Sequence, residues 1–265
     1  MHTPPPPRPV AIVTGGLRGI GHAIAHRLAA EGFDLALVDL DAPGNSTDDT
    51  LTSLPASGGR ARYYQLDISD IQAHDGVLSY IARDFTGPLA CLVNNAGIAS
   101  RPLTDVLEVD AKAFDRSLAI NLRGTFFLTQ AFARRLLDAP AAPGLHRCIV
   151  VITSIAAELV SVERAPYCIG KSALSTVARL FAARLAAHGI QVHEVRPGFI
   201  QTDMTASAGS NVIDQWIREG RVPMPRWGTP QDVADVVAVL ASGKMPYTTG
   251  QPFWVAGGLN IARAT

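Results

Sequence analysis

Short apolar runs alternate along the chain with longer stretches in which apolar and polar positions recur at helical spacing. The helical stretches include one with Ile20, Ile24 and Leu28 at four-residue intervals, and two more at Ala113–Leu137 and Tyr167–Ala187. The apolar runs predict seven strands, Val10–Thr14, Asp34–Asp39, Ala61–Leu66, Leu89–Asn94, Cys148–Thr153, Gln191–Arg196 and Pro252–Val255. Apolar strands separated by helices are typical of a parallel sheet covered on both faces. Right-handed crossovers then predict a doubly wound α/β fold.

The loop composition predicts one domain over residues 10–265. The nine residues before it hold Pro4–Pro7 and predict a flexible, extended lead-in over residues 1–9. Late in the chain, residues 206–227 interrupt the strand–helix rhythm and contain two glycines and two prolines. Such an insertion in an α/β fold often covers the substrate, so we expect a lid there.

The overall composition narrows the class of protein. The 23 basic side chains balance the 23 acidic ones, so no basic surplus favours nucleic acid as a partner. No apolar run approaches the roughly 20 residues of a membrane span, and the first residues lack a signal-peptide core. We therefore expect a cytoplasmic protein that binds neither nucleic acid nor a membrane. Cys91, Cys148 and Cys168 are expected to be reduced and buried, and their spacing predicts no metal site.

A glycine-rich loop, Thr14–Gly21, joins the first predicted strand to the first predicted helix. Glycines permit a tight turn and let backbone amides approach a pyrophosphate, while the helix N-terminus adds free N–H groups and a positive dipole end. The loop therefore predicts a dinucleotide site whose cofactor-binding residues are Gly15, Leu17, Arg18, Gly19, Ile20 and Gly21.

The end of the second predicted strand bears on the choice of dinucleotide. Asp39, followed by Leu40, stands 20 residues after Gly19, where a carboxylate accepts hydrogen bonds from the ribose hydroxyls. The same carboxylate would repel a 2′-phosphate, which favours NAD. Arg18 acts in the opposite sense, because a basic residue in this loop can pair with a 2′-phosphate. NAD is the favoured cofactor, and NADP is the alternative.

Tyr167 and Lys171 are four residues apart at the start of a predicted helix, so their side chains share one helix face. A free tyrosine has a pKa of about 10, and a nearby ammonium favours the phenolate. We expect Lys171, together with a positively charged nicotinamide, to lower the pKa of Tyr167. Ser154, just past the fifth predicted strand, is placed to hold a substrate oxygen. Such a Tyr–Lys spacing alone is more typical of an exposed helix pair.

The ordered set of motifs changes that assessment, because it resembles the short-chain dehydrogenase/reductase family from Val10 to about Ile261. The resemblance extends to 3-oxoacyl-[acyl-carrier-protein] reductases through Pro197–Met204. The motifs that carry it are Thr14–Gly21, Asp67-Ile68, Asn94–Gly97, Asn121–Gly124, Ser154, Tyr167 with Lys171, Arg196–Ile200, Thr202, Gly228–Pro230, Thr249–Gln251 and Gly257-Gly258.

The resemblance implies a Rossmann fold, a homotetramer with Ala113–Leu137 and Tyr167–Ala187 at one interface, and a role for each matched residue. Tyr167 would be the general acid/base and Ser154 would orient the substrate oxygen. Lys171 would bind the nicotinamide ribose, and Asn121 would support a proton-relaying water. The remaining implied cofactor contacts are Asp67, Ile68, Asn94, Ala96, Gly97, Thr153, Pro197, Gly198, Ile200 and Thr202.

Two enzymatic functions fit this machinery. The first is an NAD-linked dehydrogenase of a secondary alcohol or ketone, with Ser154, Tyr167 and Glu158 at the substrate. The second is a 3-oxoacyl-[acyl-carrier-protein] reductase that uses NADPH, for which Arg134 and Arg135 offer positive charge to an acidic carrier. Asp39 and the neutral net charge disfavour the second function. A third alternative is a dinucleotide sensor without catalysis, which the intact Ser, Tyr and Lys disfavour.

Overall fold

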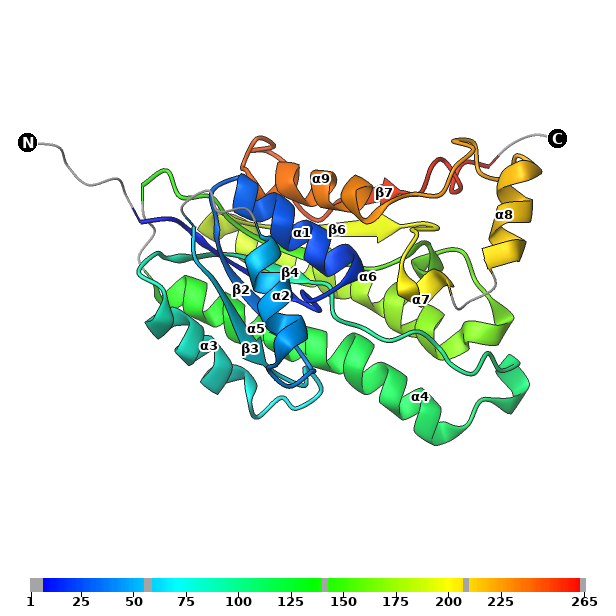
Figure 1. Ribbon diagram of the computed structural model, residues 1–265, viewed down its shortest axis with the longest axis horizontal. Helices are drawn as coiled ribbons and strands as arrows, with labels where there is room; N and C mark the ends of the chain where they lie inside the picture. The colour runs from blue at the N-terminus through cyan, green and yellow to red at the C-terminus, as the bar shows by residue number, and fades with distance from the viewer. Residues whose placement is uncertain (1–6, 55–58, 140–142, 207–209, 263–265) are drawn as a thin grey trace, which may run out of the picture.

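The computed structural model describes residues 7–54, 59–139, 143–206 and 210–262. Within them, seven parallel strands form one sheet in the order β3-β2-β1-β4-β5-β6-β7 (Figure 1). The strands are β1 (Val10–Thr14), β2 (Asp34–Asp39), β3 (Ala61–Gln65), β4 (Leu89–Asn94), β5 (Arg147–Ile152), β6 (Ile190–Pro197) and β7 (Pro252–Val255). The predicted doubly wound sheet is confirmed, and no strand boundary differs from its predicted position by more than one residue.

Helices cover both faces of this sheet. The helices within the described residues are α1 (Gly19–Ala30), α2 (Asn45–Ser53), α3 (His74–Asp84), α4 (Ala111–Leu118), α5 (Thr125–Asp138), α6 (Ala165–Leu185), α7 (Asp203–Ala206), α8 (Ser210–Arg218) and α9 (Pro230–Ala241). A π-helix, η2 (Ala119–Gly124), joins α4 to α5. The single helix predicted over Ala113–Leu137 is therefore divided by a widened turn that the apolar periodicity does not reveal.

Two apolar layers hold the helices to the sheet, because successive strand residues point to opposite faces. In β1, Val10 and Ile12 belong to the layer under α3, α5 and α6, whereas Ala11 and Val13 belong to the layer under α1 and α9. All four residues are at most 1% exposed. Figure 1 shows α1 and α9 together on one side of the strands and α3 and α5 on the other.

The strand order places a switch point between β1 and β4. The chain moves outward from β1 through β2 to β3, and then returns to the other side of β1 with β4. In open α/β sheets, ligands bind in the crevice outside the carboxyl ends of the strands at such a point. The loops after β1, β4 and β5 all open at this edge, and they carry most of the predicted site residues.

The predicted lid, residues 206–227, contains the end of α7 and all of α8, with residues 207–209 outside the described residues. Its helices lie on the side toward which β6 and β7 point (Figure 1). Phe199 stacks against Trp216 and Trp227 at centroid distances of 5.7 and 6.4 Å, and Trp227 Nε1 donates to Asp214 Oδ1 at 2.7 Å. Aromatic packing thus attaches this segment to the loop after β6, while its action as a lid stays a prediction.

The lead-in over residues 1–9 lies largely outside the described residues, which begin at residue 7. The carbonyl of Pro9 accepts from Asp34 N at 2.9 Å, and Val10 N donates to Pro88 O at 2.8 Å. The hydrogen bonding of the sheet therefore already involves the last residue of the predicted lead-in. Across the described residues, every helix is too short or too polar to traverse a lipid bilayer.

Candidate functional site

The glycine-rich loop turns sharply between β1 and α1. Gly19 has a φ of +55°, in the left-handed region that glycine adopts without steric cost. At Gly21, a side-chain Cβ would lie 1.9 Å from the carbonyl oxygen of Gly15, so only glycine fits there. Among the described residues, no side chain caps α1 and its first turn carries no acidic residue. Its first N–H groups are thus oriented for an anion.

Asn95 fixes this loop to the end of β4. Its side-chain Nδ2 donates to Thr14 O at 3.0 Å and to Gly15 O at 3.1 Å. The Thr14 hydroxyl in turn accepts from the backbone N–H groups of Asn95 and Ala96, each at 3.0 Å. Asn95 lies within the motif Asn94–Gly97, but no role was predicted for it from the sequence. The feature that could have identified Asn95 is an amide side chain directly after a buried strand at the switch point.

The end of β2 forms an acidic corner beside the loop. Asp39 Oδ2 accepts from Leu17 N at 3.3 Å, and Asp39 Oδ1 accepts from Leu40 N at 2.8 Å. Arg18 Nη1 lies 3.5 Å from Asp41 Oδ2, and both side chains are largely exposed. Two carboxylates therefore occupy the corner at which the ribose is predicted, and the second one, Asp41, was missed in the sequence.

Three of the residues that the family resemblance implies as cofactor contacts follow β3 or end β4. Asp67 is exposed, and its Oδ1 accepts from both the N–H and the hydroxyl of Ser69 at 2.8 and 2.7 Å. Ile68 is buried in the apolar layer. The Asn94 side chain donates to Thr129 Oγ1 at 2.9 Å, toward α5. The Asn94 amide group is thus bound to α5, and its contact with a cofactor stays a prediction.

A widened helical turn brings Asn121 to the loop after β4. Asn121 lies in the π-helix η2, is fully buried, and exchanges hydrogen bonds with the backbone of Ile98 at 2.9 and 3.0 Å. A Cβ at Gly97 would lie 2.7 Å from Asn121 Oδ1 and 3.7 Å from Lys171 Nζ. Single π-turns are frequent at functional sites. Here the turn places Asn121, Gly97 and Lys171 around one small space.

The predicted catalytic side chains meet at the carboxyl end of β5. Lys171 is buried, its Nζ lies 5.6 Å from the centroid of the Tyr167 ring, and it donates to Ile152 O at 3.0 Å. Ser154 follows β5, and its Oγ accepts from Ala156 N at 3.1 Å, which begins the 3-10 turn η3 (Ile155–Ala157). The structure therefore brings the three residues together as predicted.

Burial shifts the pKa values of both residues of the Tyr167–Lys171 pair. Burial raises the pKa of Tyr167, against the opposing effects of a hydrogen bond with Ser154 and the charge of Arg164. Burial also lowers the pKa of Lys171 to about 8, with the carboxylate of Glu194 acting in the opposite direction. The expected lowering of the Tyr167 pKa involves Lys171 together with a positively charged nicotinamide, and it stays a prediction.

The loop after β6 reaches back to the glycine-rich loop. A Cβ at Gly198 would lie 2.8 Å from the Ala256 Cα, so the chain passes directly against the end of β7. Ile200 is buried and forms a parallel bridge with Gly228. The Thr202 methyl carbon lies 3.6 Å from the position of a Cβ at Gly19. The segment Pro197–Thr202 thus lies beside the glycine-rich loop, and its contacts with a cofactor stay a prediction.

Glu158 and Thr153, two further predicted site residues, are bound to a charged pair that the sequence did not identify. Glu158 Oε1 forms an ion pair with Arg196 Nη1, and Thr153 Oγ1 donates to Glu194 Oε1 at 2.6 Å. Glu158 is 57% exposed, whereas Glu194 and Arg196 are almost fully buried. The sequence feature that could have revealed this pair is the presence of charged residues at alternate positions of a predicted core strand.

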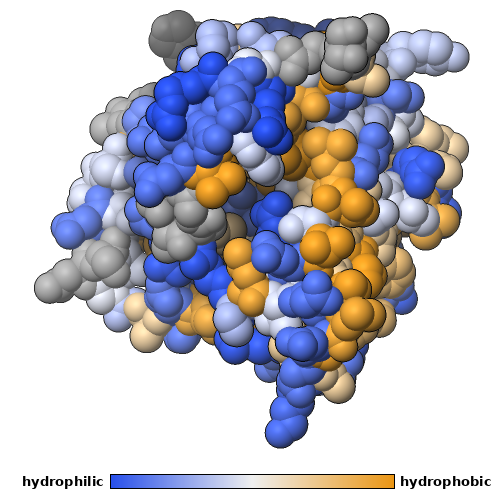
Figure 2. All heavy atoms as spheres, turned by 90° about the vertical axis from the view of Figure 1, so that its right-hand side faces the viewer, coloured by the Kyte–Doolittle hydropathy of each residue, from blue (hydrophilic) through white to orange (hydrophobic). Residues whose placement is uncertain are grey.

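The surface at the carboxyl edge of the sheet is hollowed, with apolar side chains gathered along one side of the hollow (Figure 2). The 3-10 turns η1 (Val106–Glu108) and η4 (Val162–Arg164) contact each other at this edge, and Thr104 N donates to Glu163 O at 3.1 Å. Leu107 and Val160 are 91% and 85% exposed. A substrate with an apolar part would find a matching surface on these segments.

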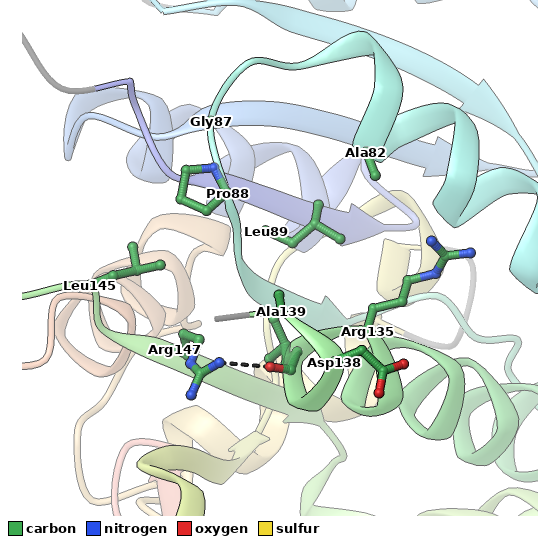
Figure 3. Close-up of a pocket in the computed structure, with 10 residues that line it drawn as sticks. Ala82, Gly87, Pro88, Leu89, Arg135, Asp138, Ala139, Leu145 and Arg147 are labelled. Atoms are coloured by element: carbon green, nitrogen blue, oxygen red, sulfur yellow. Dashed lines mark hydrogen bonds between the residues drawn. The ribbon is translucent and has the colours of Figure 1, made fainter. Parts of the chain in front are cut away.

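A separate cavity of about 450 Å³ lies at the opposite edge, near the amino ends of β4 and β5 (Figure 3). Arg147 Nη1 donates to Leu136 O at 2.7 Å within it, and Arg135 Nη2 donates to Asp75 O and Ser79 Oγ, each at 2.8 Å. At 1.5 Å per helical residue, this end of α5 is roughly 20 Å from Asn121. Arg134 and Arg135 therefore lie near the end of α5 that is far from Asn121.

Cys91 and Cys148, on neighbouring strands, and Cys168 on α6 are free, buried thiols, as predicted. In the described part of the chain, no cluster of three or more His, Cys, Asp or Glu side chains has the geometry of a metal site.

Comparisons with known proteins agree with this geometry. Residues 15–260 match the family model described as enoyl-(acyl carrier protein) reductase. The (3R)-3-hydroxyacyl-CoA dehydrogenase of Mus musculus is 36% identical over 257 residues, which cover 94% of this chain and 95% of that protein. The crystal structure of 3-oxoacyl-[acyl-carrier protein] reductase from Brucella melitensis in complex with NAD has a TM-score of 0.92 and 41% identity, over 97% of this chain and 99% of that one.

A third relative carries the other dinucleotide. The crystal structure of a putative 2-deoxy-d-gluconate 3-dehydrogenase from Agrobacterium tumefaciens with bound NADP has a TM-score of 0.81 and 32% identity. The match covers 95% of this chain and 96% of that one. The same fold thus accepts either dinucleotide, and the choice has to be made by individual side chains.

Proposed function

This chain belongs to the short-chain dehydrogenase/reductase family, and on that premise we propose which residues, cofactor and substrate surface it uses. It is an oxidoreductase that interconverts CH–OH and C=O groups with a nicotinamide cofactor. The observation that carries the assignment of residues is the meeting of Tyr167, Lys171 and Ser154 at the carboxyl end of β5.

The chain's own residues fit a dinucleotide. The uncapped N-terminus of α1 suits the pyrophosphate, and the carboxylate of Asp39 beside Leu17 N suits the ribose hydroxyls. Gly97 leaves open the space next to Lys171 Nζ, where the nicotinamide ribose is expected. When bound, the nicotinamide supplies or accepts the hydride.

The protein supplies the proton and the orientation. In the reductive direction, the Tyr167 hydroxyl donates its proton to the carbonyl oxygen, which Ser154 Oγ holds by a hydrogen bond. In the oxidative direction, the phenolate accepts the hydroxyl proton. Because burial raises the pKa of Tyr167, its protonated form is favoured unless nearby positive charge stabilises the phenolate. Lys171 and a bound, positively charged nicotinamide provide that charge, and Asn121 at the adjoining space supports relay to solvent.

We infer NAD rather than NADP as the cofactor. Asp39 and Asp41 both lie where a 2′-phosphate would be placed, and Arg18, the basic residue of the loop, already lies 3.5 Å from Asp41. Pairing Arg18 with a 2′-phosphate would leave both carboxylates facing like charge. The ribose hydroxyls of NAD meet no such repulsion.

The substrate class we propose is a secondary alcohol or the corresponding ketone. A second candidate, reduction of a 3-oxoacyl thioester with NADPH, is favoured by the apolar residues around Leu107 and Val160 and by the names of the relatives. The feature that would favour an acyl carrier protein as partner is the pair Arg134 and Arg135 near the end of α5. A sensor without catalysis is disfavoured because the catalytic residues are assembled.

We also propose a homotetramer in the cytoplasm. Ile169 and Leu180 on α6 are 47% and 59% exposed, so this helix retains apolar surface for a second copy. The three free thiols are compatible with a reducing compartment. Light scattering is expected to give four times the mass of the 28.1 kDa chain, and a monomer would contradict the assembly.

A screen of secondary alcohols, polyols and 3-hydroxyacyl thioesters tests these proposals. Each compound is incubated with NAD and with NADP in parallel, and formation of the reduced cofactor is followed at 340 nm. We expect turnover of a secondary alcohol with NAD. Faster turnover of the thioester with NADP would favour the second candidate. Lack of turnover across all classes, with tight cofactor binding, would favour a sensor.

A further inference from the structure

The central strand β6 carries charge at a place where a strand covered on both faces is expected to be apolar. Ile190 and Val192 point into the layer beneath α6, and alternation places Glu194 and Arg196 on the same face. Their relative exposures are only 3% and 6%. Taking an ion out of water costs several kcal/mol, and apolar residues of similar volume often give equal or greater stability. Stabilisation of the core therefore does not explain why Glu194 and Arg196 are buried there.

The Glu194 carboxylate joins three elements at once. Its Oε1 accepts from Thr153 Oγ1 at 2.6 Å, from Ser175 Oγ at 2.7 Å and from Arg196 Nε at 2.6 Å. Arg196 Nη2 donates to Glu194 Oε2 and to Ser175 Oγ, both at 3.2 Å. Three hydrogen bonds on one carboxylate oxygen satisfy the buried charge and connect the end of β5, the middle of α6 and β6.

These partners are neighbours of the catalytic residues. Thr153 directly precedes Ser154, and Ser175 lies one helical turn beyond Lys171 on the same face of α6. Ser154 and Tyr167 belong to different elements, so their relative position depends on how the end of β5 is held against α6. The carboxylate of Glu194 forms that connection directly.

Arg196 holds the other side of Ser154. Its Nη1 forms an ion pair with Glu158, the residue that ends the turn η3 after Ser154. Its guanidinium lies 4.9 Å from the centroid of the Trp254 ring, which fixes it by a cation–π contact. Ser154 is thus bracketed by Thr153 before it and Glu158 after it, and both are bound to the same charged pair.

We propose that Glu194 and Arg196 form a positioning clamp that sets the distance between Ser154 and Tyr167, and that Glu158 belongs to this clamp instead of binding substrate. The inference rests on the proposed function, because it takes Ser154 and Tyr167 as the catalytic pair. A misplacement of about 1 Å in a catalytic group can cost about 100-fold in rate. The negative charge of Glu194 also favours the protonated form of Lys171.

The first experiment compares Glu194→Gln with the wild-type enzyme, using the secondary alcohol turned over in the screen and its C-deuterated form. We expect kcat to fall about 10- to 100-fold, with the KM for NAD and the Kd for NADH within about twofold of wild type. The deuterium isotope effect on kcat should increase, because the hydride step becomes more fully rate-limiting. A loss of stability alone would not produce this combination.

Two further variants separate positioning from stability. Val192→Ala removes a buried side chain on the same face of β6, so it should destabilise the fold while leaving kcat unchanged. The double variant Glu194→Leu/Arg196→Met replaces the clamp by apolar residues. We expect it to keep a Tm near wild type and still to lose about 10- to 100-fold in kcat. A well-folded double variant with wild-type kcat overturns the inference.

Hydrogen exchange of residues 153–158 gives a readout that needs no substrate. We expect these amides to exchange at least about tenfold faster in Glu194→Gln than in the wild type, and at the wild-type rate in Val192→Ala. Unchanged exchange in Glu194→Gln overturns the clamp, whatever the activity. If the wild type turns over no compound while the exchange rates change as expected, the proposed function fails and the clamp stands.

Discussion

The two halves of the sheet's carboxyl edge consist of different kinds of chemical group. Around β1 and β2, the predicted cofactor site consists of backbone amides, a close glycine contact at Gly21 and the half-buried carboxylate of Asp39. Around β5 and β6, the catalytic region is made of buried ionisable side chains, with Lys171 and Glu194 both nearly inaccessible to solvent. We therefore expect backbone shape to determine binding in the first half and desolvated charge to determine chemistry in the second.

That difference has energetic consequences. A backbone site is insensitive to most side-chain changes but intolerant of a single added Cβ. A charged site is costly to bury and sensitive to the loss of any partner, because the remaining partner is then buried without compensation. The following variants test the contrast, from the largest expected effect to the smallest.

Replacing Tyr167 by Phe tests the charged half most directly. Removing the hydroxyl deletes the proton donor, so kcat should fall by about 10³-fold or more, while the Kd for NADH, measured by fluorescence, stays within about twofold. The fully exposed Tyr247 provides the matched control, and Tyr247→Phe should behave as wild type. Turnover above a tenth of the wild-type rate in Tyr167→Phe would remove Tyr167 from the reaction.

Replacing Lys171 by Met separates stability from activity. Burial lowers the pKa of Lys171 from 10.5 to about 8, so below pH 8 the folded protein holds an unfavourably buried ammonium. Between pH 8 and 10.5 the unfolded chain binds more protons than the folded one, and wild-type stability should rise with pH. Lys171→Met should therefore be more stable at pH 7, by at most about 3 kcal/mol, yet inactive.

Chemical denaturation at pH 7 and pH 10 checks this. The advantage of Lys171→Met should shrink at the higher pH, because the wild-type lysine is then mostly neutral. The exposed Lys112 is the control, and Lys112→Met should show no such dependence. A less stable Lys171→Met at pH 7 would mean that the hydrogen bond to Ile152 O outweighs the burial of charge.

Adding one methyl group at Gly21 tests the backbone half. A Cβ there would lie 1.9 Å from Gly15 O, so the loop must move, and we expect the Kd for NADH to rise about 100-fold or more. Gly76 on α3 has open space around it, so Gly76→Ala should be neutral or stabilise the fold by about 0.4–1 kcal/mol. The Kd of each variant for NADH is measured by fluorescence titration. Equal affinities would show that the dinucleotide does not occupy this loop.

Removing the Asp39 carboxylate tests whether this group makes the protein prefer NAD over NADP. Asp39→Ala should raise the ratio of kcat/KM for NADP to that for NAD by about 10-fold, because the carboxylate nearest to the 2′ position is lost. Asp41 remains, so discrimination should be weakened, not abolished. Asp49→Ala, at an exposed position of α2, is the control. An unchanged ratio in Asp39→Ala would place the ribose elsewhere.

The sequence predicted the backbone half almost completely. Apolar runs located the strands within one residue, because a strand buried on both faces needs continuous hydrophobicity. Glycine spacing identified the loop between β1 and α1, because only glycine permits its φ angles and close contacts. The Tyr167–Lys171 spacing likewise follows from local helix geometry. Each of these features is local in the chain, so its signal is contained in a short segment.

In the charged half, the sequence predicted Ser154, Tyr167 and Lys171, but only the tertiary structure decided what surrounds them. The π-turn that carries Asn121 leaves the apolar period of the predicted helix Ala113–Leu137 unbroken. The raised pKa of Tyr167 depends on how much protein surrounds its ring, which spacing along a helix does not report. The joining of Thr153, Ser175 and Glu158 by Glu194 and Arg196 involves residues separated by up to 41 positions. Burial and long-range pairing are properties of the packed chain, so they become defined only when the sheet and its helices are assembled.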